Sequence, residues 1–167
     1  STKNIALIDK TNIHNNRLQV INQYAIGQGD GGAKRSNRYD VTVLVNGLPM
    51  VHVELKRRGV DIREGFNQIA RYQRDSFWSG SGLFDYVQLF VISNGTLTKY
   101  YSNTTRHRHI SDAAGKKRQR KTSDSFEFTS WWADAANKPI QDLTAFAKRF
   151  FARHTLLRIL TRYCVLT

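Results

Sequence analysis

Two acidic side chains and a lysine near the middle of the chain have types and spacing that could form a site for a divalent cation. Asp40 precedes a run of alternating valines, and Glu54 and Lys56 close a second such run with one residue between them. Hard divalent cations take carboxylate oxygens as ligands. The three side chains can cooperate only if the chain between them folds back on itself.

That intervening chain predicts a β-hairpin. Residues 39–45 and 50–56 alternate with the period of two that marks strands, and Asn46-Gly47 between them is a strong hairpin signal. The valines of both strands should share one buried face with Leu55. The acidic residues and Lys56 should then project together from the other side of the sheet.

The register of the hairpin decides whether the two carboxylates meet. A three-residue loop over 46–48 would put Val45 opposite Pro49 and Asp40 opposite Glu54. A two-residue turn would shift the pairing by one and mix the faces, which half-buried strands avoid, so we expect the longer loop. Directly opposed side chains lie about 4.5–5.5 Å apart, so two carboxylates there would repel each other unless a cation lay between them. A divalent metal ion is the natural occupant.

This arrangement resembles the PD-(D/E)xK nuclease superfamily, whose core is an acidic residue, a hairpin and then (D/E)-x-K. A closer resemblance covers most of the chain, from about Arg17 to the C-terminus. It is carried by the blocks NRYDVTVLVNGLPMVHVELKRRG, IREGFNQIARY and LFVISNG. These blocks resemble the N-terminal nuclease domain of the restriction (R, motor) subunit of type I restriction-modification enzymes.

The resemblance implies the fold and the domain organisation. The fold would be α/β, a central mixed β-sheet flanked by helices as in restriction endonucleases. Residues 1–167 would form a single PD-(D/E)xK endonuclease domain, a fragment of a longer R subunit whose helicase-like motor domains are absent from this chain. No G-x-x-x-x-G-K-[ST] phosphate-binding pattern occurs in the sequence, so ATP would bind only to the full-length subunit.

The resemblance also implies an activity and a metal. Asp40 and Glu54, with the backbone carbonyl of Leu55, would hold Mg²⁺, for which Mn²⁺ could substitute. Lys56 would orient the attacking water or stabilise charge on phosphorus. The full enzyme would cut double-stranded DNA non-specifically after ATP-driven translocation, in complex with methylation and specificity subunits.

A helix after the hairpin carries further candidates. Asp61 can cap it, and apolar residues at helical spacing over 62–70 predict its buried stripe. Gln68 and Tyr72 lie four residues apart and therefore share a face. They match the Q-x-x-x-Y motif of the family, which implies contact with DNA or support of Lys56. A tyrosine at the edge of the core beside a solvated glutamine is the alternative explanation of the same pair.

The charge of the chain favours a polyanionic partner such as DNA. The net charge is +13, from 26 Lys and Arg against 13 Asp and Glu. Arg71 and Arg74, farther round the predicted helix, could contact backbone phosphates or only water. The polar segment 103–121 could be a DNA-contacting arm or merely a solvated loop, and its basic candidates are Lys116, Lys117, Arg118, Arg120 and Lys121.

Composition excludes several other classes of protein. A single cysteine, Cys164, rules out an internal disulfide framework and a cysteine-based zinc site, and it suits a reducing compartment. No apolar run approaches the roughly 20 residues of a membrane span, and nothing at the N-terminus resembles a signal peptide. We therefore expect a cytoplasmic protein with no membrane partner.

The remaining pattern predicts the other elements. Strands are expected at 3–9, 17–26, 85–93 and 97–101, a short strand around Phe126 and Phe128, and helices over 140–152 and 155–163.

Two other functions remain open from the sequence. The chain could be a non-catalytic DNA-binding or subunit-docking module in which the acidic pair is structural. It could also be a repair or junction nuclease of the same superfamily, although such an enzyme would not share the N-G-L-P and I-S-N-G blocks.

Overall fold

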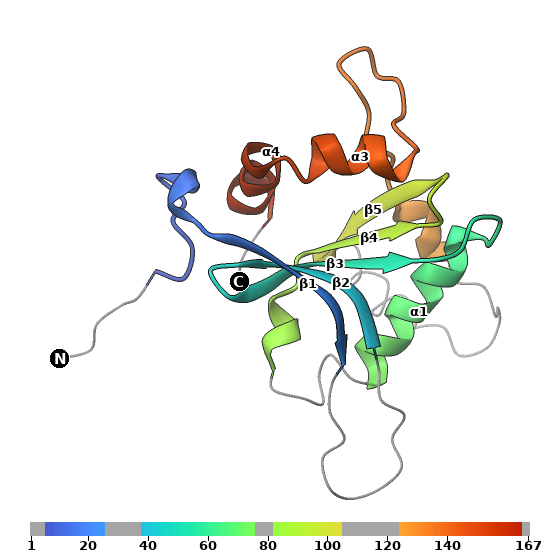
Figure 1. Ribbon diagram of the computed structural model, residues 1–167, viewed down its shortest axis with the longest axis horizontal. Helices are drawn as coiled ribbons and strands as arrows, with labels where there is room; N and C mark the ends of the chain where they lie inside the picture. The colour runs from blue at the N-terminus through green and yellow to red at the C-terminus, as the bar shows by residue number, and fades with distance from the viewer. Residues whose placement is uncertain (1–5, 26–37, 76–81, 105–123, 165–167) are drawn as a thin grey trace, which may run out of the picture.

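A computed structural model describes residues 6–25, 38–75, 82–104 and 124–164. These residues form a five-stranded sheet with helices on both faces (Figure 1), so the expected α/β fold is confirmed. The strands are β1 (Leu18–Ala25), β2 (Arg38–Val45), β3 (Leu48–Leu55), β4 (Leu89–Ser93) and β5 (Thr98–Ser102). The helices are α1 (Ile62–Asp75), α3 (Leu143–Phe150) and α4 (Arg153–Arg158), and the short helical turns are η1 (Ile13–Asn15), η2 (Leu83–Tyr86), η3 (Asp124–Phe128) and the π-helical η4 (Ile159–Tyr163).

The strands lie side by side in chain order, β1-β2-β3-β4-β5. Only β3 and β4 are parallel; the other three neighbouring pairs are antiparallel. The connection between β3 and β4 contains α1, because parallel neighbours need a crossover rather than a tight turn. All five residues of β4 are buried, as its nearly continuous apolar sequence predicts for a central strand covered on both faces.

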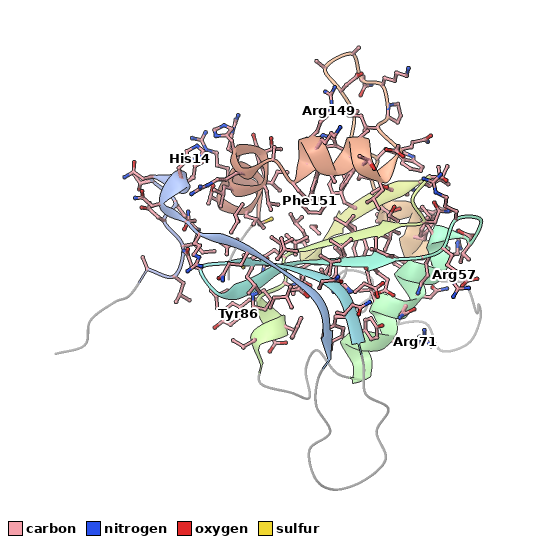
Figure 2. All side chains as sticks on the ribbon, viewed as in Figure 1. His14, Arg57, Arg71, Tyr86, Arg149 and Phe151 are labelled. Atoms are coloured by element: carbon pink, nitrogen blue, oxygen red, sulfur yellow. The ribbon has the colours of Figure 1, made fainter. Side chains whose placement is uncertain are left out.

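Each face of the sheet packs against its own helical layer (Figures 1 and 2). On one face α1 contributes Phe66 and Ile69 to a core shared with Phe90 and Ile92 of β4. On the other face α3 and α4 cover the valines of β2 and β3, and this core includes Val43, Val45, Val51, Val53, Phe146, Phe150, Leu156, Leu157 and Leu160. The alternation of the valines therefore places them all on the face of the sheet that α3 and α4 cover.

The hairpin turn is shorter than the sequence led us to expect. Val45 pairs with Leu48 and not with Pro49, so the loop contains two residues. Asn46 and Gly47 both have positive φ values, 52° and 86°. Positive φ at both central positions is the requirement of a type I′ turn, for which Asn-Gly is a preferred sequence. The prediction of a three-residue loop was therefore wrong, because the preference of Asn46-Gly47 for a two-residue type I′ turn decides the loop length.

A β-bulge then restores the register that the longer loop would have produced. The pairing shifts by one between Val43 and Leu44, which leaves Met50 outside the β2–β3 pairing. Beyond the shift, Val41 pairs with Val53. Bulges of this kind let two successive residues deviate from strict alternation, and Met50 and its neighbour Val51 are both fully buried in the same core.

The helix that carries the Q-x-x-x-Y motif forms as predicted. The Asp61 side chain accepts a hydrogen bond from the Arg63 backbone N–H at 2.9 Å, which caps the first turn of α1. Ile62, Phe66 and Ile69 are buried along one stripe. In the described part of the chain, no helix is long and apolar enough to cross a lipid bilayer.

Several predicted boundaries were wrong. The helix expected over 140–152 begins only at Leu143, because Asp142 accepts a hydrogen bond from the Ala145 N–H at 2.9 Å and so fixes the N-terminus. The segment 124–128 forms the turn η3 instead of a strand, and its Phe126 ring packs against Phe66 of α1 at a centroid distance of 5.8 Å.

Three other predicted elements also differ from the observed ones. The strand expected over 85–93 is limited to its second half, since η2 occupies the residues before it. Residues 6–9 of the strand expected over 3–9 are not in a strand, and 1–5 lie outside the described residues. The last predicted helix is observed as α4 continuing into η4.

Candidate active site

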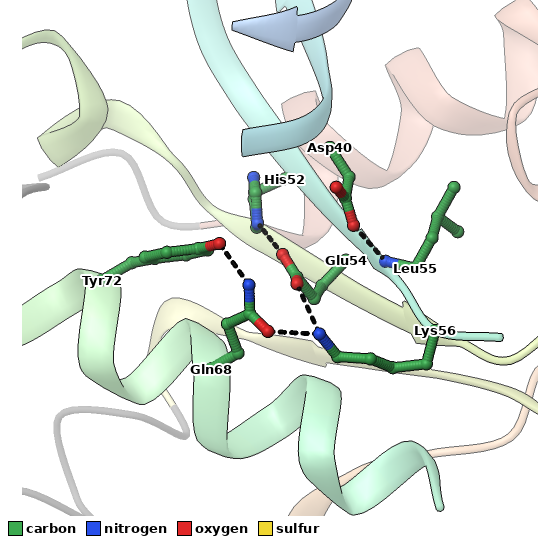
Figure 3. A network of polar contacts seen from close by, with 7 residues as sticks. All are labelled: Asp40, His52, Glu54, Leu55, Lys56, Gln68 and Tyr72. Atoms are coloured by element: carbon green, nitrogen blue, oxygen red, sulfur yellow. Dashed lines mark hydrogen bonds and ion pairs between the residues drawn. The ribbon is translucent and has the colours of Figure 1, made fainter. Parts of the chain in front are cut away.

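The candidate site lies where the end of β3, the beginning of β2 and one side of α1 meet (Figure 3). Glu54 and Lys56 come from the C-terminal end of β3 and its extension, while Gln68 and Tyr72 project from α1. The β3 strand leads directly to α1, which folds back over the same face of the sheet. This local path brings the E-x-K and Q-x-x-x-Y motifs together.

Glu54 is the most enclosed member of the site. Its side chain is 0% exposed, and its Oε1 atom accepts a hydrogen bond from Lys56 Nζ at 3.1 Å. Its Oε2 atom lies 3.3 Å from His52 Nε2. Because a carboxylate without partners is costly to bury, these two contacts are what allow an acidic side chain at this depth.

Lys56 connects the strand to the helix. Its side chain is 18% exposed, so the ammonium group reaches the surface while it contacts the buried carboxylate. The Nζ atom also donates a hydrogen bond to Gln68 Oε1, and Gln68 Nε2 in turn donates to the Tyr72 hydroxyl (Figure 3). The chain of contacts therefore runs from Glu54 through Lys56 and Gln68 to Tyr72.

Tyr72 stays in its neutral phenol form at ordinary pH. Burial raises the pKa of Tyr72 above its usual value, the hydrogen bond from Gln68 opposes this change, and the negative charges of Glu54 and Asp40 raise it further. The Tyr72 ring also packs edge-on against Tyr39 at a centroid distance of 5.0 Å. Tyr72 is thus an uncharged hydrogen-bonding wall of the site, and 6% of it is exposed.

Asp40 lies on the neighbouring strand. It is one residue before Val41, which pairs with Val53, so the bulged register brings Asp40 beside Glu54. The Asp40 Oδ2 atom accepts a hydrogen bond from the Leu55 backbone N–H at 2.8 Å. This bond fixes the half-buried carboxylate against the strand that carries Glu54.

His52 belongs to the site but was not among the residues selected from the sequence. It is completely buried, contacts Glu54, and packs edge-on against Tyr39 and Tyr72 at centroid distances of 5.5 and 6.0 Å. The available signal was its position two residues before Glu54, which puts both side chains on one face of the strand. The burial of both side chains, which makes the contact energetically important, could not be predicted from the sequence.

The predicted DNA-contacting residues are only partly covered by the structure. Arg71 is exposed on α1 (Figure 2). Arg74 lies in the helix, but its side chain lies outside the described residues, as does the whole basic group Lys116, Lys117, Arg118, Arg120 and Lys121.

The oxygen ligands of the site fit a small hard cation. Asp40 and Glu54 supply carboxylates from adjacent strands, and Leu55 between Glu54 and Lys56 supplies a backbone carbonyl. Across the described segments, no three His, Cys, Asp or Glu side chains gather closely enough to hold an ion by themselves. Mg²⁺ commonly binds one or two carboxylates and completes its shell with water and substrate phosphate, so a site of this composition suits it.

The fold and the site define the class of protein. A mixed five-stranded sheet covered by helices, with acidic residues on the adjacent strands β2 and β3 and a lysine just after β3, is an α/β domain of the restriction-endonuclease-like kind. The model of the family "type I restriction enzyme R protein N terminus (HSDR_N)" matches residues 1–109. The chain therefore belongs to this family.

Two curated proteins with extensive similarity to the chain are endonuclease subunits of type I restriction enzymes. The type I restriction enzyme EcoprrI endonuclease subunit of Escherichia coli is 48% identical over 163 residues, which are 98% of this chain and 46% of that protein. The SauCOLORF180P endonuclease subunit of Staphylococcus aureus (strain COL) is 38% identical over 162 residues, 97% of this chain and 15% of that protein. The chain thus spans less than half of the length of either relative.

Proposed function

We propose that this chain is the Mg²⁺-dependent endonuclease domain of a type I restriction enzyme R subunit, and that it hydrolyses phosphodiester bonds of double-stranded DNA. The observation that carries the proposal is the position of Lys56 Nζ, 3.1 Å from the buried Glu54 carboxylate and hydrogen bonded to Gln68. A cation held in this way at the surface is prepared for a phosphate before the phosphate arrives, and such preorganised charge is commonly the largest catalytic contribution.

The roles of the side chains follow from their contacts. Asp40 and Glu54, with the Leu55 carbonyl, would hold Mg²⁺, or Mn²⁺ in its place. The bound metal would supply Lewis-acid chemistry, polarising the phosphate and making water a stronger nucleophile. Lys56 would stabilise the negative charge that develops on the phosphorus oxygens or orient the water. Gln68 would keep the Lys56 ammonium group in place.

The proposal extends to the whole enzyme through the named relatives, which are endonuclease subunits of type I restriction enzymes. Residues 1–167 would be one nuclease domain attached to ATP-driven motor domains. The complete subunit would work in the cytoplasm with methylation and specificity subunits and would cut DNA non-specifically after translocation.

Substitution of Lys56 tests the proposal. In the intact enzyme, Lys56→Ala should lower the rate of DNA cleavage by at least about 100-fold, because it removes a preplaced positive charge, while ATP hydrolysis and translocation continue. Lys148→Ala is the matched control, since Lys148 is exposed on α3. Cleavage by Lys56→Ala at the rate of the control would refute the catalytic assignment and favour a docking or DNA-binding module.

A further inference from the structure

Two cations outside the candidate active site converge on one aromatic ring. The Arg63 guanidinium carbon lies 4.7 Å from the centroid of the Phe126 ring, and Lys99 Nζ lies 4.8 Å from the centroid of the same ring. Lys99 Nζ also lies 4.8 Å from the ring of Trp131. Arg63, Lys99 and Phe126 together are called the basic clamp below.

Three separate elements hold the clamp in place. Arg63 is in the first turn of α1, and Lys99 is on β5, where it pairs with Ile92 and so shares the face of the sheet that α1 covers. Phe126 comes from η3 and packs against Phe66 of α1. The two cations are therefore positioned by a helix, a strand and a packed ring, and are only half-exposed.

The positive charge of the clamp has no counterpart in the described part of the chain. The two ion pairs found among the described residues both involve Glu54, and neither includes Arg63 or Lys99. A cation in the first turn of a helix also faces the positive end of the helix dipole, where an anion would be favoured. Burial, followed by the charge of Arg63, lowers the pKa of Lys99. An anion bound beside both side chains would offset the like-charge repulsion and the unfavourable interaction of Arg63 with the helix dipole.

Packing alone does not explain the arrangement. One cation over an aromatic face is a favourable contact, but Arg63 and Lys99 share the Phe126 ring, and their like charges repel each other although Lys99 also lies over Trp131. Repulsion between like charges held in this way is typical of sites that bind an oppositely charged ligand.

We propose that the basic clamp binds a backbone phosphate of duplex DNA. This inference rests on the proposed function for its choice of ligand. The clamp lies on the same face of the sheet as Lys56, and α1 connects the two: Arg63 precedes Gln68 by five residues, which is a rise of about 7.5 Å along the helix. A duplex that extends along α1 from Lys56 would bring further phosphates of its backbone to the clamp. Its contact would carry no sequence information, as is usual for phosphate contacts.

The test measures duplex binding by the 167-residue chain. The double variant Arg63→Gln/Lys99→Gln is compared with Lys148→Gln/Arg149→Gln, which removes the same two charges from α3. Arg149 and Arg71 lie on opposite sides of the sheet (Figure 2), so the control alters the face away from α1. Fluorescence anisotropy with a 30-base-pair duplex of arbitrary sequence, titrated at several salt concentrations, yields the affinity and its salt dependence.

If the clamp binds one phosphate, its double variant should bind every duplex sequence more weakly, and the slope of log K against log salt should fall by about 1. The charge-exchanged variant Arg63→Lys/Lys99→Arg should bind like the unaltered chain, and circular dichroism should verify that all variants are folded. The proposal is overturned if the clamp variant loses no more affinity than the α3 control, or if the unaltered chain shows no salt-dependent binding of duplex DNA.

The outcomes separate the clamp from the nuclease proposal. Lys56→Ala should keep cutting by the intact enzyme at least about 100-fold slower even when the DNA concentration saturates the enzyme. The clamp variant should weaken binding, with cutting restored when the DNA concentration saturates the enzyme. Normal binding by the clamp variant would therefore refute the clamp and leave the nuclease assignment intact.

Discussion

Glu54 illustrates how a single residue combines structural and chemical demands. Its carboxylate is fully buried and is held by Lys56 on one oxygen and His52 on the other. A buried charged group that loses a partner exposes the protein to the full cost of its desolvation. The stability of this part of the sheet therefore depends on the same contacts that make up the candidate site.

Replacing His52 should reveal this dependence. We expect His52→Leu to lower the free energy of unfolding by about 1–3 kcal/mol, because Glu54 Oε2 is left buried without its donor. Urea unfolding of His52→Leu, Glu54→Leu and the double variant should give a coupling energy of about 0.5–3 kcal/mol. A coupling near zero would mean that the 3.3 Å contact contributes nothing.

Thr42 provides a control for this experiment. It pairs with His52 across the β2–β3 ladder, and its buried Oγ1 atom has no hydrogen-bond partner in the part of the chain that the structure describes. Thr42→Val keeps the shape and removes only the hydroxyl, so it should leave stability nearly unchanged or raise it.

At the level of single residues, the sequence predicted less about the surroundings than about the motif. The spacing put Glu54 and Lys56 on one face of a strand and Gln68 and Tyr72 on one face of a helix, while the closeness of Lys56 to Gln68 was implied only by the resemblance to the family. The burial of Glu54 beside His52 depends on which side chains the helical layer covers, and no local pattern records that. The chemical roles of Asp40, Glu54 and Lys56 stay predictions.

At the level of elements, the β2–β3 hairpin shows how two correct local rules can combine into an unexpected structure. The Asn46-Gly47 sequence favours a two-residue turn, while the valine pattern requires the register of a longer loop. The bulge at Met50 satisfies both. The sequence therefore predicted the partners of the distal half of the hairpin correctly and the turn itself incorrectly, because a bulge has no reliable sequence signal.

Two glycine substitutions should have opposite effects on these elements. Gly65 lies inside α1, where an added Cβ would make ordinary contacts of 3.6 Å with Glu54 and Ile92. Gly65→Ala should raise the free energy of unfolding by about 0.5–1 kcal/mol, because alanine is the better helix former. Gly47→Ala should lower it by about 1 kcal/mol, since φ is +86° in the turn although the space around it is open.

Chemical denaturation of both variants checks this pair of predictions. A gain from Gly47→Ala would contradict the type I′ turn. A large loss from Gly65→Ala would mean that α1 lies closer to β3 than the contacts indicate.

For the whole molecule, the two helical layers have different roles. The layer of α1 provides the side chains around Lys56, whereas the layer of α3 and α4 encloses the valine face and contributes no residue to the candidate site. The α/β class and most strands could be predicted from periodicity, because hydrophobic alternation reports burial directly. The start of α3 could not, since it depends on which polar residue captures the first free N–H groups.

Cys164 reports on the α3–α4 layer. Burial raises the pKa of its thiol to about 11, so its thiolate is scarce at neutral pH. In the folded chain, its reaction with a thiol reagent should be slow and should accelerate about tenfold per pH unit from pH 7 to 9.5. In urea the rate should level off near pH 8.5, the usual value for an exposed cysteine.

The raised pKa of Cys164 also makes the stability of the fold depend on pH. Because the folded-state pKa is raised, the contribution of Cys164 is complete below about pH 8.5 and is lost as the pH rises toward 11. Equal reaction rates with and without urea at pH 8 would show that the end of η4 does not pack against the core.

Every residue of the candidate site lies between Asp40 and Tyr72, in one hairpin and the helix that follows it. Short separations along the chain make such contacts quick to form, since little loop-closure entropy opposes them. The candidate site is therefore encoded in one continuous stretch of the chain. During synthesis, these residues leave the ribosome well before the C-terminal helices that complete the opposite layer.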